Sequence, residues 1–259
     1  MVKKIDKEDL LKHIDDKEKI IVLRQVIDKI ESVSINHSVL TTDFLDPYEV
    51  KLSQSILNRF LEIAYSIDGG YGDSERAIIY IYPEYLFAPE LEEIVKFQIK
   101  SDNVIEHKDV LGSLIGLGID RKKVGDILIY EDTSIFFVKR EIADFIELNL
   151  DKIGNNKVNP IRINEFDFPE KEYTESTKII SSLRLDTVIG AVYNLSRSNA
   201  QSLIDADKVK HNFKKEDKSS IILNDGDVVS VRKYGRFIVD KIEGRTKKEK
   251  YRVKIKIPK

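Results

Sequence analysis

The chain has 259 residues, of which 41% are hydrophobic and 34% are charged, which is typical of folded soluble proteins and excludes a disordered chain. It contains no apolar run of 18 residues, and its first twenty residues alternate charges with single apolar residues. Neither a membrane span nor a signal peptide is therefore predicted, and the cytoplasm is the expected location.

The composition also argues against metal chemistry. The chain has no cysteine, which excludes disulfides, thiolate nucleophiles and cysteine-ligated zinc. The four histidines, His13, His37, His107 and His211, are scattered without the spacing of metal ligands. We therefore expect no metal site and no cofactor.

The net charge of -2 hides an uneven distribution of charge. Residues 178–259 hold 20 Lys and Arg against 10 Asp and Glu, whereas the rest of the chain holds 23 against 35. A basic region is what binding to a phosphate backbone requires, because each bound cation releases condensed counterions. A solvated charged surface would have the same composition, so only motifs can decide between the two.

Residues 1–75 are expected to form a small helical domain. Apolar residues at spacings of three and four predict an amphipathic helix over residues 18–33. A second helix is predicted from the Asp46-Pro47 cap to Ile67, where Asp68-Gly69-Gly70 would end it.

Residues 76–166 are expected to form a mixed sheet with helices on one side, a common α+β layout. The strands are expected at residues 77–82, 94–99, 126–130, 135–139 and 161–166. The helices are expected at residues 108–117 and at about 142–153.

Residues 164–177 are acidic and polar, so they are interpreted as a linker before a third domain at residues 178–259. The apolar pattern predicts one helix over residues 183–192 and a second helix capped by Ser196. Arg197 would lie in the first turn of that second helix, where free backbone N–H groups favour a phosphate.

The third domain resembles the S-four-type (alpha-L) RNA-binding domain over roughly residues 181–240. The resemblance is carried by Arg184-Leu185-Asp186, Ser196-Arg197, Ala200, Leu203-Ile204, residues 209–212, Gly226-Asp227, Arg232 and Gly235-Arg236-Phe237. That family implies two helices and a hairpin that grip structured RNA. The chain departs from it where glycines are usual, at Asp207-Lys208 and at Lys233, so we expect those turns to adopt a different geometry rather than a strained one.

The rest of the chain is similar to the YlmH family, whose members have the same three-part order. The matching segments are Phe44-Leu45-Asp46-Pro47, Asp68-Gly69-Gly70-Tyr71 with Glu75-Arg76, residues 107–112, Leu117-Gly118-Ile119 and Val124-Gly125-Asp126-Ile127. This resemblance implies a factor that binds the large ribosomal subunit near tRNA and takes part in the rescue of stalled translation. The expected partners are structured RNA, both large-subunit rRNA and tRNA, and the ribosome, with no membrane and no small-molecule substrate.

Candidate RNA-binding residues follow from the charge, the caps and the resemblance together. Phosphate contacts are expected from Arg184, Arg197, Lys208, Lys210, Lys214, Arg232 and Arg236. Ser196 and Asn212 would supply directional hydrogen bonds, and Tyr234 would stack on an unpaired base. Secondary contacts in the central domain are His107, Lys108, Arg121, Lys122 and Lys123, which makes that domain a candidate second RNA-binding domain.

Two other classes of function compete with RNA binding without catalysis. An RNA-modifying enzyme is suggested by Arg184-Leu185-Asp186, which resembles the catalytic strand of some pseudouridine synthases. Here the triplet opens a helix, so Asp186 is interpreted as a structural charge. The glycines between Leu111 and Gly118 lie in an apolar helix and are interpreted as close packing and a helix stop, not as a methyltransferase loop. An adaptor linked to cell division, with an acidic partner-binding region, is the remaining alternative.

Overall fold

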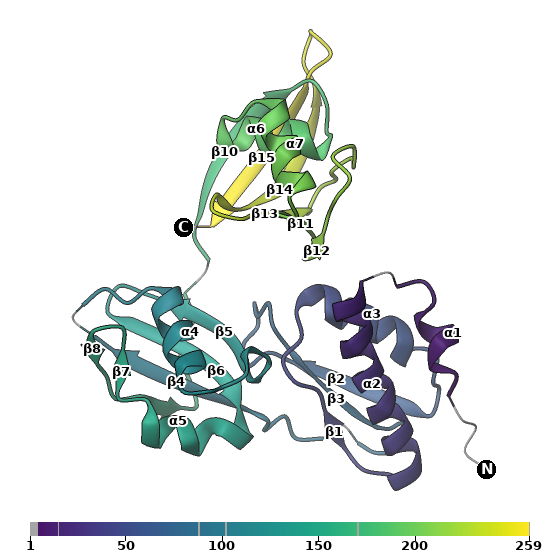
Figure 1. Ribbon diagram of the computed structural model, residues 1–259, viewed down its shortest axis with the longest axis vertical. Helices are drawn as coiled ribbons and strands as arrows, with labels where there is room; N and C mark the ends of the chain where they lie inside the picture. The colour runs from purple at the N-terminus through teal and green to yellow at the C-terminus, as the bar shows by residue number, and fades with distance from the viewer. Residues whose placement is uncertain (1–4, 15, 88, 102, 170, 259) are drawn as a thin grey trace. The chain divides into compact units, whose positions relative to one another are not determined.

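The computed structural model describes residues 5–14, 16–87, 89–101, 103–169 and 171–258. The chain divides into two compact units, residues 1–166 and 167–259. In the described residues, the first unit contains two main sheets with separate cores and a small two-stranded sheet, and the second unit is built around one sheet (Figure 1). Within the described residues, no helix combines the length and apolarity needed to cross a membrane.

The first part of unit 1 is a three-stranded antiparallel sheet covered by helices. Its elements are α1 (Lys7–Leu11), α2 (Lys17–Asn36), β1 (Leu40–Thr41), α3 (Pro47–Leu57), β2 (Ile63–Asp68) and β3 (Ile78–Pro83), with strand order β1-β3-β2. Helix α3 begins as expected, because Asp46 and Glu49 form a capping box around Pro47. The apolar faces of α2 and α3 share one core with β3, which buries Leu23, Ile27, Ile56, Ile79 and Ile81.

Two expectations for this region are wrong. The helix predicted to reach Ile67 ends at Leu57, and residues 63–68 form β2 paired with β3 along its length. Isoleucines four apart fit a helical face, but a strand also accommodates them when a partner strand supplies hydrogen bonds. Because β3 is the central strand of this sheet, a domain boundary between residues 75 and 76 would cut the sheet, and the first domain is not purely helical.

The second part of unit 1 has the expected sheet with helices packed against a single core. Its elements are β4 (Ile94–Lys100), α4 (His107–Gly116), η1 (Arg121–Lys123), β5 (Val124–Ile129), β6 (Thr133–Lys139), η2 (Arg140–Ile142), α5 (Ala143–Asn149), β7 (Lys152–Ile153), β8 (Asn156–Lys157) and β9 (Ile161–Ile163). The antiparallel sheet has the order β5-β6-β4-β9, and β7 pairs with β8. The helix predicted to reach residue 153 ends earlier, at Asn149, since β7 follows at once.

Unit 2 is a six-stranded antiparallel sheet with two helices packed on one face (Figure 1). Its elements are β10 (Tyr173–Ile180), α6 (Leu185–Tyr193), α7 (Arg197–Asp205), β11 (Val209–His211), β12 (Lys214–Lys215), β13 (Val228–Val231), β14 (Gly235–Arg245) and β15 (Tyr251–Pro258). The strand order is β10-β15-β14-β13-β11-β12. The two helices and the strands that the S-four-type resemblance implies are therefore present.

The prediction of a linker over residues 164–177 and of a third domain starting at residue 178 is wrong in part. Residues 173–180 form β10, which pairs with β15 from Tyr173 opposite Pro258 to Ile180 opposite Tyr251. The segment looks like a linker because one of its faces is exposed and polar. It forms a strand because β15, near the other end of the unit, supplies the backbone hydrogen bonds.

The turns at the two glycine departures keep the left-handed backbone. Asp207 has a φ of 55° and Lys233 a φ of 74°. The expectation of a different, unstrained geometry is therefore wrong at both positions. A left-handed conformation costs a residue other than glycine about 1–2 kcal/mol, and least for Asp or Asn, so Lys233 is the more strained of the two.

Candidate RNA-binding surfaces

A buried carboxylate organises the helix side of unit 2. Asp186 is only 1% exposed and accepts hydrogen bonds from Arg184 Nη2 at 2.9 Å and from Arg197 Nε at 3.0 Å. Thr187 Oγ1 also donates to it, at 3.0 Å. Burial alone would raise the pKa of Asp186, but the hydrogen bonds from Arg184, Arg197 and Thr187 outweigh it and lower the pKa to about 2. Asp186 thus has the structural role expected of it.

This network limits what the two arginines offer to RNA. The Arg184 side chain is 31% exposed and that of Arg197 is 62% exposed, so each can present only the donors that Asp186 does not use. Ser196 is the predicted cap of α7, because its Oγ accepts the Asn199 amide hydrogen at 3.2 Å. The helix start therefore brings together Arg184, Ser196 and Arg197.

A second group of predicted residues lies on the opposite face of the same sheet. Lys210 is directly opposite Ser230 on β13, and Ser230 is opposite Arg236 on β14. The neighbouring residues Val209, Val229 and Phe237 are buried under the helices, so Lys210, Ser230 and Arg236 point away from the core. We call Lys210, Lys215, Ser230 and Arg236 the cross-strand row, since Lys215 is opposite Lys210 on β12.

The cross-strand row also contains an aromatic contact. Arg236 donates from Nε to Ser230 Oγ at 3.2 Å, and its guanidinium lies 5.2 Å from the centre of the Phe213 ring. An arginine against an aromatic ring next to lysines is a common arrangement in single-stranded RNA sites. Lys215 and Phe213 were not predicted. Strict alternation from the inward Val209 would place Lys215 inward; the turn at Asn212 and Phe213 brings it opposite Lys210 instead, and nothing in the sequence indicates the Phe213 contact.

Lys208 and Arg232 meet at one end of β11 and β13, where the Arg232 amide donates to the Lys208 carbonyl at 2.8 Å. Both side chains are exposed, and within the described residues neither is bonded to a carboxylate. Tyr234 is 44% exposed, and its ring centre lies 5.4 Å from that of Tyr193 on α6. One side of Tyr234 is thus already packed, and only the rest is available to a base.

Asn212 has an internal role in the structure. Its φ is 48°, its Nδ2 donates to Asp227 Oδ1 at 2.7 Å, and its Oδ1 accepts the Val228 amide hydrogen at 2.9 Å. Asp227 also lies 3.0 Å from His211 Nε2. The side-chain amide of Asn212 therefore stabilises a turn. The prediction that it is free to bond RNA is wrong. Lys214 is exposed, but it lies opposite His211 and hence on the other face from Lys210.

The secondary candidates in unit 1 are divided between surface and interior. Lys108 is exposed and paired with Glu106 at 2.8 Å, whereas His107 is the first residue of α4. Burial, together with the nearby Arg121 charge, lowers the pKa of His107. Arg121 turns inward and donates from Nη1 to the Val124 and Gly125 carbonyls. Lys122 and Lys123 both face Asp43.

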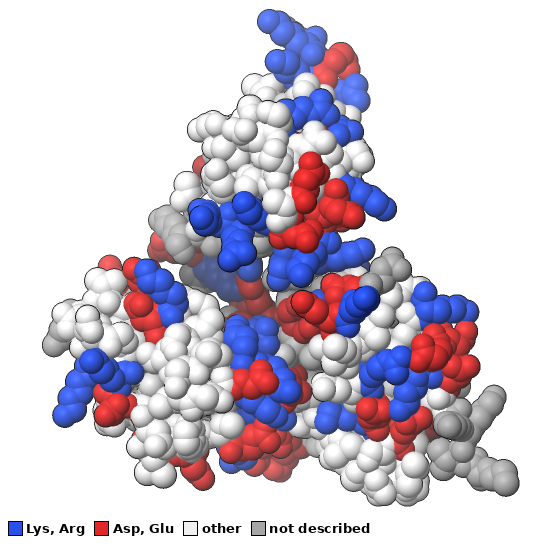
Figure 2. Space-filling view, in the orientation of Figure 1, with Lys and Arg blue, Asp and Glu red and all other residues white. Residues whose placement is uncertain are grey.

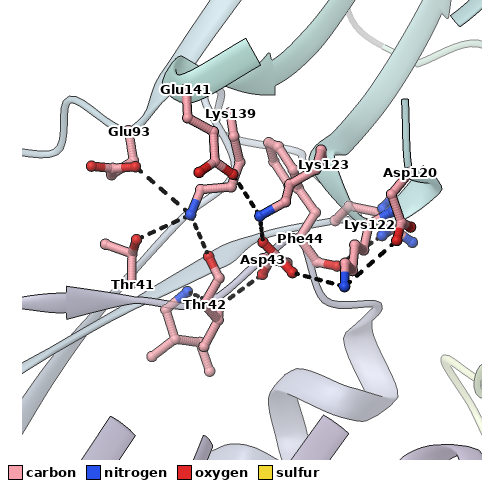
Figure 3. A network of polar contacts seen from close by, with 12 residues as sticks. Thr41, Thr42, Asp43, Phe44, Glu93, Asp120, Lys122, Lys123, Lys139 and Glu141 are labelled. Atoms are coloured by element: carbon pink, nitrogen blue, oxygen red, sulfur yellow. Dashed lines mark hydrogen bonds and ion pairs between the residues drawn. The ribbon is translucent and has the colours of Figure 1, made fainter. Parts of the chain in front are cut away.

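Lys123 and Lys139 belong to a polar network between the two sheets of unit 1, shown in Figure 3. Lys123 Nζ lies 2.5 Å from both Asp43 Oδ1 and Glu141 Oε1. Lys139 is only 6% exposed, and its Nζ donates to Thr41 Oγ1 at 3.2 Å and to the Thr42 carbonyl at 3.1 Å. These contacts tie the loop after β1 to the central sheet.

Three sequence segments that are far apart meet beside this network. Asp126 accepts hydrogen bonds from Tyr71 Oη at 2.9 Å and from the Glu75 and Arg76 amides at 2.7 and 3.1 Å. Arg76 in turn donates to the Val124 carbonyl at 3.1 Å and to the Phe44 carbonyl at 2.8 Å. The segments around Phe44, Arg76 and Asp126 therefore form one junction between the two sheets.

Both parts of unit 1 match known protein families. Residues 18–86 match the family described as "YlmH, N-terminal", and residues 89–168 match "Putative RNA-binding domain in YlmH". The chain is 33% identical over 222 residues to "Ribosome-associated protein quality control protein P2" of Bacillus subtilis (strain 168), a match that covers 82% of this chain and 84% of that protein. The chain belongs to the YlmH family.

A solved member of the YlmH family is similar in structure as well. "Cell division protein ylmH from Streptococcus pneumoniae" superposes with a TM-score of 0.51 at 26% identity, covering 57% of this chain and 92% of that one. The two matched YlmH regions meet between residues 86 and 89, after β3, which agrees with β3 belonging to the first sheet. The YlmH region described as RNA-binding is the central one and contains Arg121.

Proposed function

We propose that the protein binds structured RNA of the large ribosomal subunit, both rRNA and tRNA, and acts without catalysis in the rescue of stalled translation in the cytoplasm. The observation that carries this proposal is the cross-strand row of unit 2 together with the exposed cations Lys208 and Arg232. The description of the matched region as RNA-binding and the name of the Bacillus subtilis relative support the same class of function.

The surface of unit 2 is suited to a phosphate backbone. Lys208, Lys210, Lys214 and Arg232 are exposed and have no carboxylate partner in the described part of the chain. The space-filling view shows basic side chains gathered at the β14–β15 turn, where Lys247, Lys248 and Lys250 follow Arg245 (Figure 2). Residues facing each other across strands lie about 5 Å apart, close enough for neighbouring cations to contact successive phosphates.

The proposed RNA contacts are those predicted residues whose side chains keep an exposed or unbonded polar group. Lys208, Lys210, Lys214, Arg232 and Arg236 bind phosphates, with the outer donors of Arg184 and Arg197. Ser196 offers its hydroxyl, and Tyr234 offers its exposed side to a base. His107, Lys108 and Lys122 remain secondary contacts in the central region. Asn212 is left out because its amide is bonded within the domain.

The geometry at Asp186 argues for binding and against pseudouridine synthase chemistry. A catalytic aspartate must reach the substrate, but this carboxylate is 1% exposed and is already bonded to two guanidiniums and a hydroxyl. The Arg184-Leu185-Asp186 triplet therefore holds α6 and α7 together.

Sedimentation of a native lysate through sucrose gradients tests the proposal. The wild-type chain should migrate with the large subunit at low salt and leave it at high salt. The Arg197→Ala, Arg232→Ala double variant should shift to the top of the gradient. A Lys51→Ala, Arg59→Ala variant is the matched control, since it removes the same charge from two exposed positions of the first domain.

Two outcomes would overturn the proposal. Migration of the wild-type chain at the top of every gradient would exclude a ribosome-bound factor. Association that survives both nuclease treatment and the Arg197→Ala, Arg232→Ala change would instead favour a protein-interaction adaptor.

A further inference from the structure

The junction between the two sheets of unit 1 contains a pair of guanidiniums that the proposed function does not use. Arg76 Nε donates to the Val124 carbonyl at 3.1 Å, and Arg121 Nη1 donates to the same carbonyl oxygen. Two positive groups therefore converge on one neutral acceptor. Among the described residues, neither arginine forms an ion pair with a carboxylate.

Both arginines keep unused hydrogen-bond donors. A guanidinium has five N–H donors. Arg76 uses one on Nε and one on Nη2, the latter to the Phe44 carbonyl at 2.8 Å. Arg121 uses Nη1 alone, for the Val124 and Gly125 carbonyls. The rest, including Nη1 of Arg76 and Nη2 of Arg121, have no acceptor within the described residues.

The two arginines line a cavity of 740 Å³ between the sheets. In the part of the chain that the structure describes, each carboxylate that lines the cavity forms an ion pair with a lysine. Asp28 pairs with Lys7, Asp46 and Glu49 pair with Lys19, Asp43 and Glu141 pair with Lys123, and Asp120 pairs with Lys122. Among the described residues, therefore, no carboxylate that lines the cavity forms an ion pair with Arg76 or Arg121.

The positions of the two arginines are fixed by the fold. Asp126 binds the Arg76 amide and its neighbours, which anchors the segment before β3 on β5. Gly125 lets the sheets approach, because a Cβ there would lie 2.7 Å from Cε1 of Phe44. Burial, followed by the charge of Arg76, lowers the pKa of Arg121 to about 10, and burial likewise lowers the pKa of Arg76. The charges of Glu49, Asp46 and Asp126 raise the pKa of Arg76, and Asp126 raises that of Arg121, but in both cases burial has the larger effect.

We propose that Arg76 and Arg121 form a binding site for a phosphate group in the cavity between the two sheets of unit 1. Paired guanidiniums match the oxygens of a phosphate through parallel hydrogen bonds, which a single lysine cannot do. The cavity lies in the size range of small-molecule sites, so it accepts either a free phosphorylated molecule or one phosphate of an RNA strand. Binding of a free phosphorylated molecule is independent of the proposed function, whereas binding of an RNA phosphate rests on it.

Nuclear magnetic resonance of the arginine side chains of the full-length protein tests the site directly. Sodium phosphate should shift the Nε–Hε signals of Arg76 and Arg121 in a saturable way, and sodium chloride at equal ionic strength should not. The Arg121→Gln variant should bind phosphate at least tenfold more weakly. Lys108→Gln is the charge-matched control, because Lys108 is exposed and pairs only with Glu106. Arg76 also bridges two carbonyls, so its substitution is less suitable.

A second titration, with a single-stranded RNA oligonucleotide, identifies the source of the phosphate. If RNA shifts the Arg121 signal and Arg121→Gln weakens RNA binding, the site takes a backbone phosphate. If only inorganic phosphate shifts the signal, the site takes a small phosphorylated ligand. Signals that move with neither ligand, or move equally with chloride, would overturn the proposal. Either result leaves the test of Arg197 and Arg232 on the ribosome unaffected.

Discussion

Arg197 donates from Nε to Asp186 Oδ2 at 3.0 Å, which joins the start of α7 to the first turn of α6. Arg184 binds the same carboxylate from the residue before α6. Two of the proposed RNA contacts are therefore oriented by one buried aspartate. The carboxylate holds one part of each guanidinium, and the remaining donors are the ones offered to RNA.

Asp186→Asn should destabilise unit 2. The change leaves two guanidiniums without a counter-ion, and breaking a buried ion pair costs about 3–5 kcal/mol. We expect about 2 kcal/mol here, because Arg197 is 62% exposed and can be rehydrated. Urea unfolding at neutral pH measures this loss in the free energy of unfolding. Glu249→Gln, which breaks the exposed pair with Arg245, is the control and should change little. Equal losses for both variants would contradict the role of Asp186.

The same carboxylate predicts a dependence of stability on pH. The pKa of Asp186 is lowered from 3.8 to about 2 in the folded chain, since the bonds from Arg184, Arg197 and Thr187 outweigh burial. Its contribution is therefore fully present above the unfolded pKa and is lost as the pH falls through the folded pKa. The difference in unfolding free energy between wild type and Asp186→Asn should shrink by about 2 kcal/mol between pH 5 and pH 2. A constant difference would exclude this titration.

Binding of RNA by unit 2 should depend on the cross-strand row. Replacing both Lys210 and Arg236 with Ala removes two cations on β11 and β14, which flank Ser230 of β13, so the slope of log affinity against log salt should fall by about two. Filter binding to a structured rRNA fragment at several salt concentrations measures the slope. Lys51→Ala with Arg59→Ala is again the control. An unchanged slope would show that the row does not face the backbone.

Gly125→Ala should weaken the junction in unit 1. The new Cβ would lie 2.7 Å and 2.8 Å from two carbons of the Phe44 ring, so the sheets must move apart, at about 1–3 kcal/mol. Thermal unfolding should show a lower midpoint. Gly112→Ala is the contrasting variant, because nothing lies within 4 Å of its Cβ, and in a helix it should stabilise by about 0.5–1 kcal/mol. This space also shows that Gly112 is not the close-packing position expected from the sequence.

Lys233→Gly should stabilise unit 2 by about 0.5 kcal/mol, because Lys233 has a φ of 74° and glycine relieves the left-handed strain at the expense of chain entropy. Lys241→Gly, within β14, should destabilise instead, since the strand there requires no such conformation. Urea unfolding of both variants measures the contrast. A loss of stability in Lys233→Gly would mean that the turn is not strained.

Helix caps and a hairpin were predicted correctly from short segments of the sequence. The capping box at Asp46, the Ser196 cap and the β5–β6 hairpin are as expected, because each depends on residues a few positions apart. Strands β2 and β10 were missed, since their pairing partners are distant and their own patterns fit a helix or a linker.

The candidate site was predictable to a similar degree. Composition located the basic region, and the helix cap placed Arg197. The hydrogen bond from Asn212 to Asp227 could not be predicted, because the sequence around a polar turn residue is the same whether its side-chain amide is free or bonded. The meeting of Arg76 with Arg121 was hidden too, since it depends on two strands of different sheets bringing their ends together.

The pairing of β10 with β15 has a consequence for synthesis of the chain. Tyr173 lies opposite Pro258, so the sheet of unit 2 is completed only after residue 258 has left the ribosome. Until then β15 is missing between β10 and β14, and both neighbours have unpaired edges. Unit 1 needs no residue beyond Phe166 and can fold first. During translation unit 2 therefore completes its fold after unit 1, and the RNA binding that we propose for unit 2 becomes possible only then.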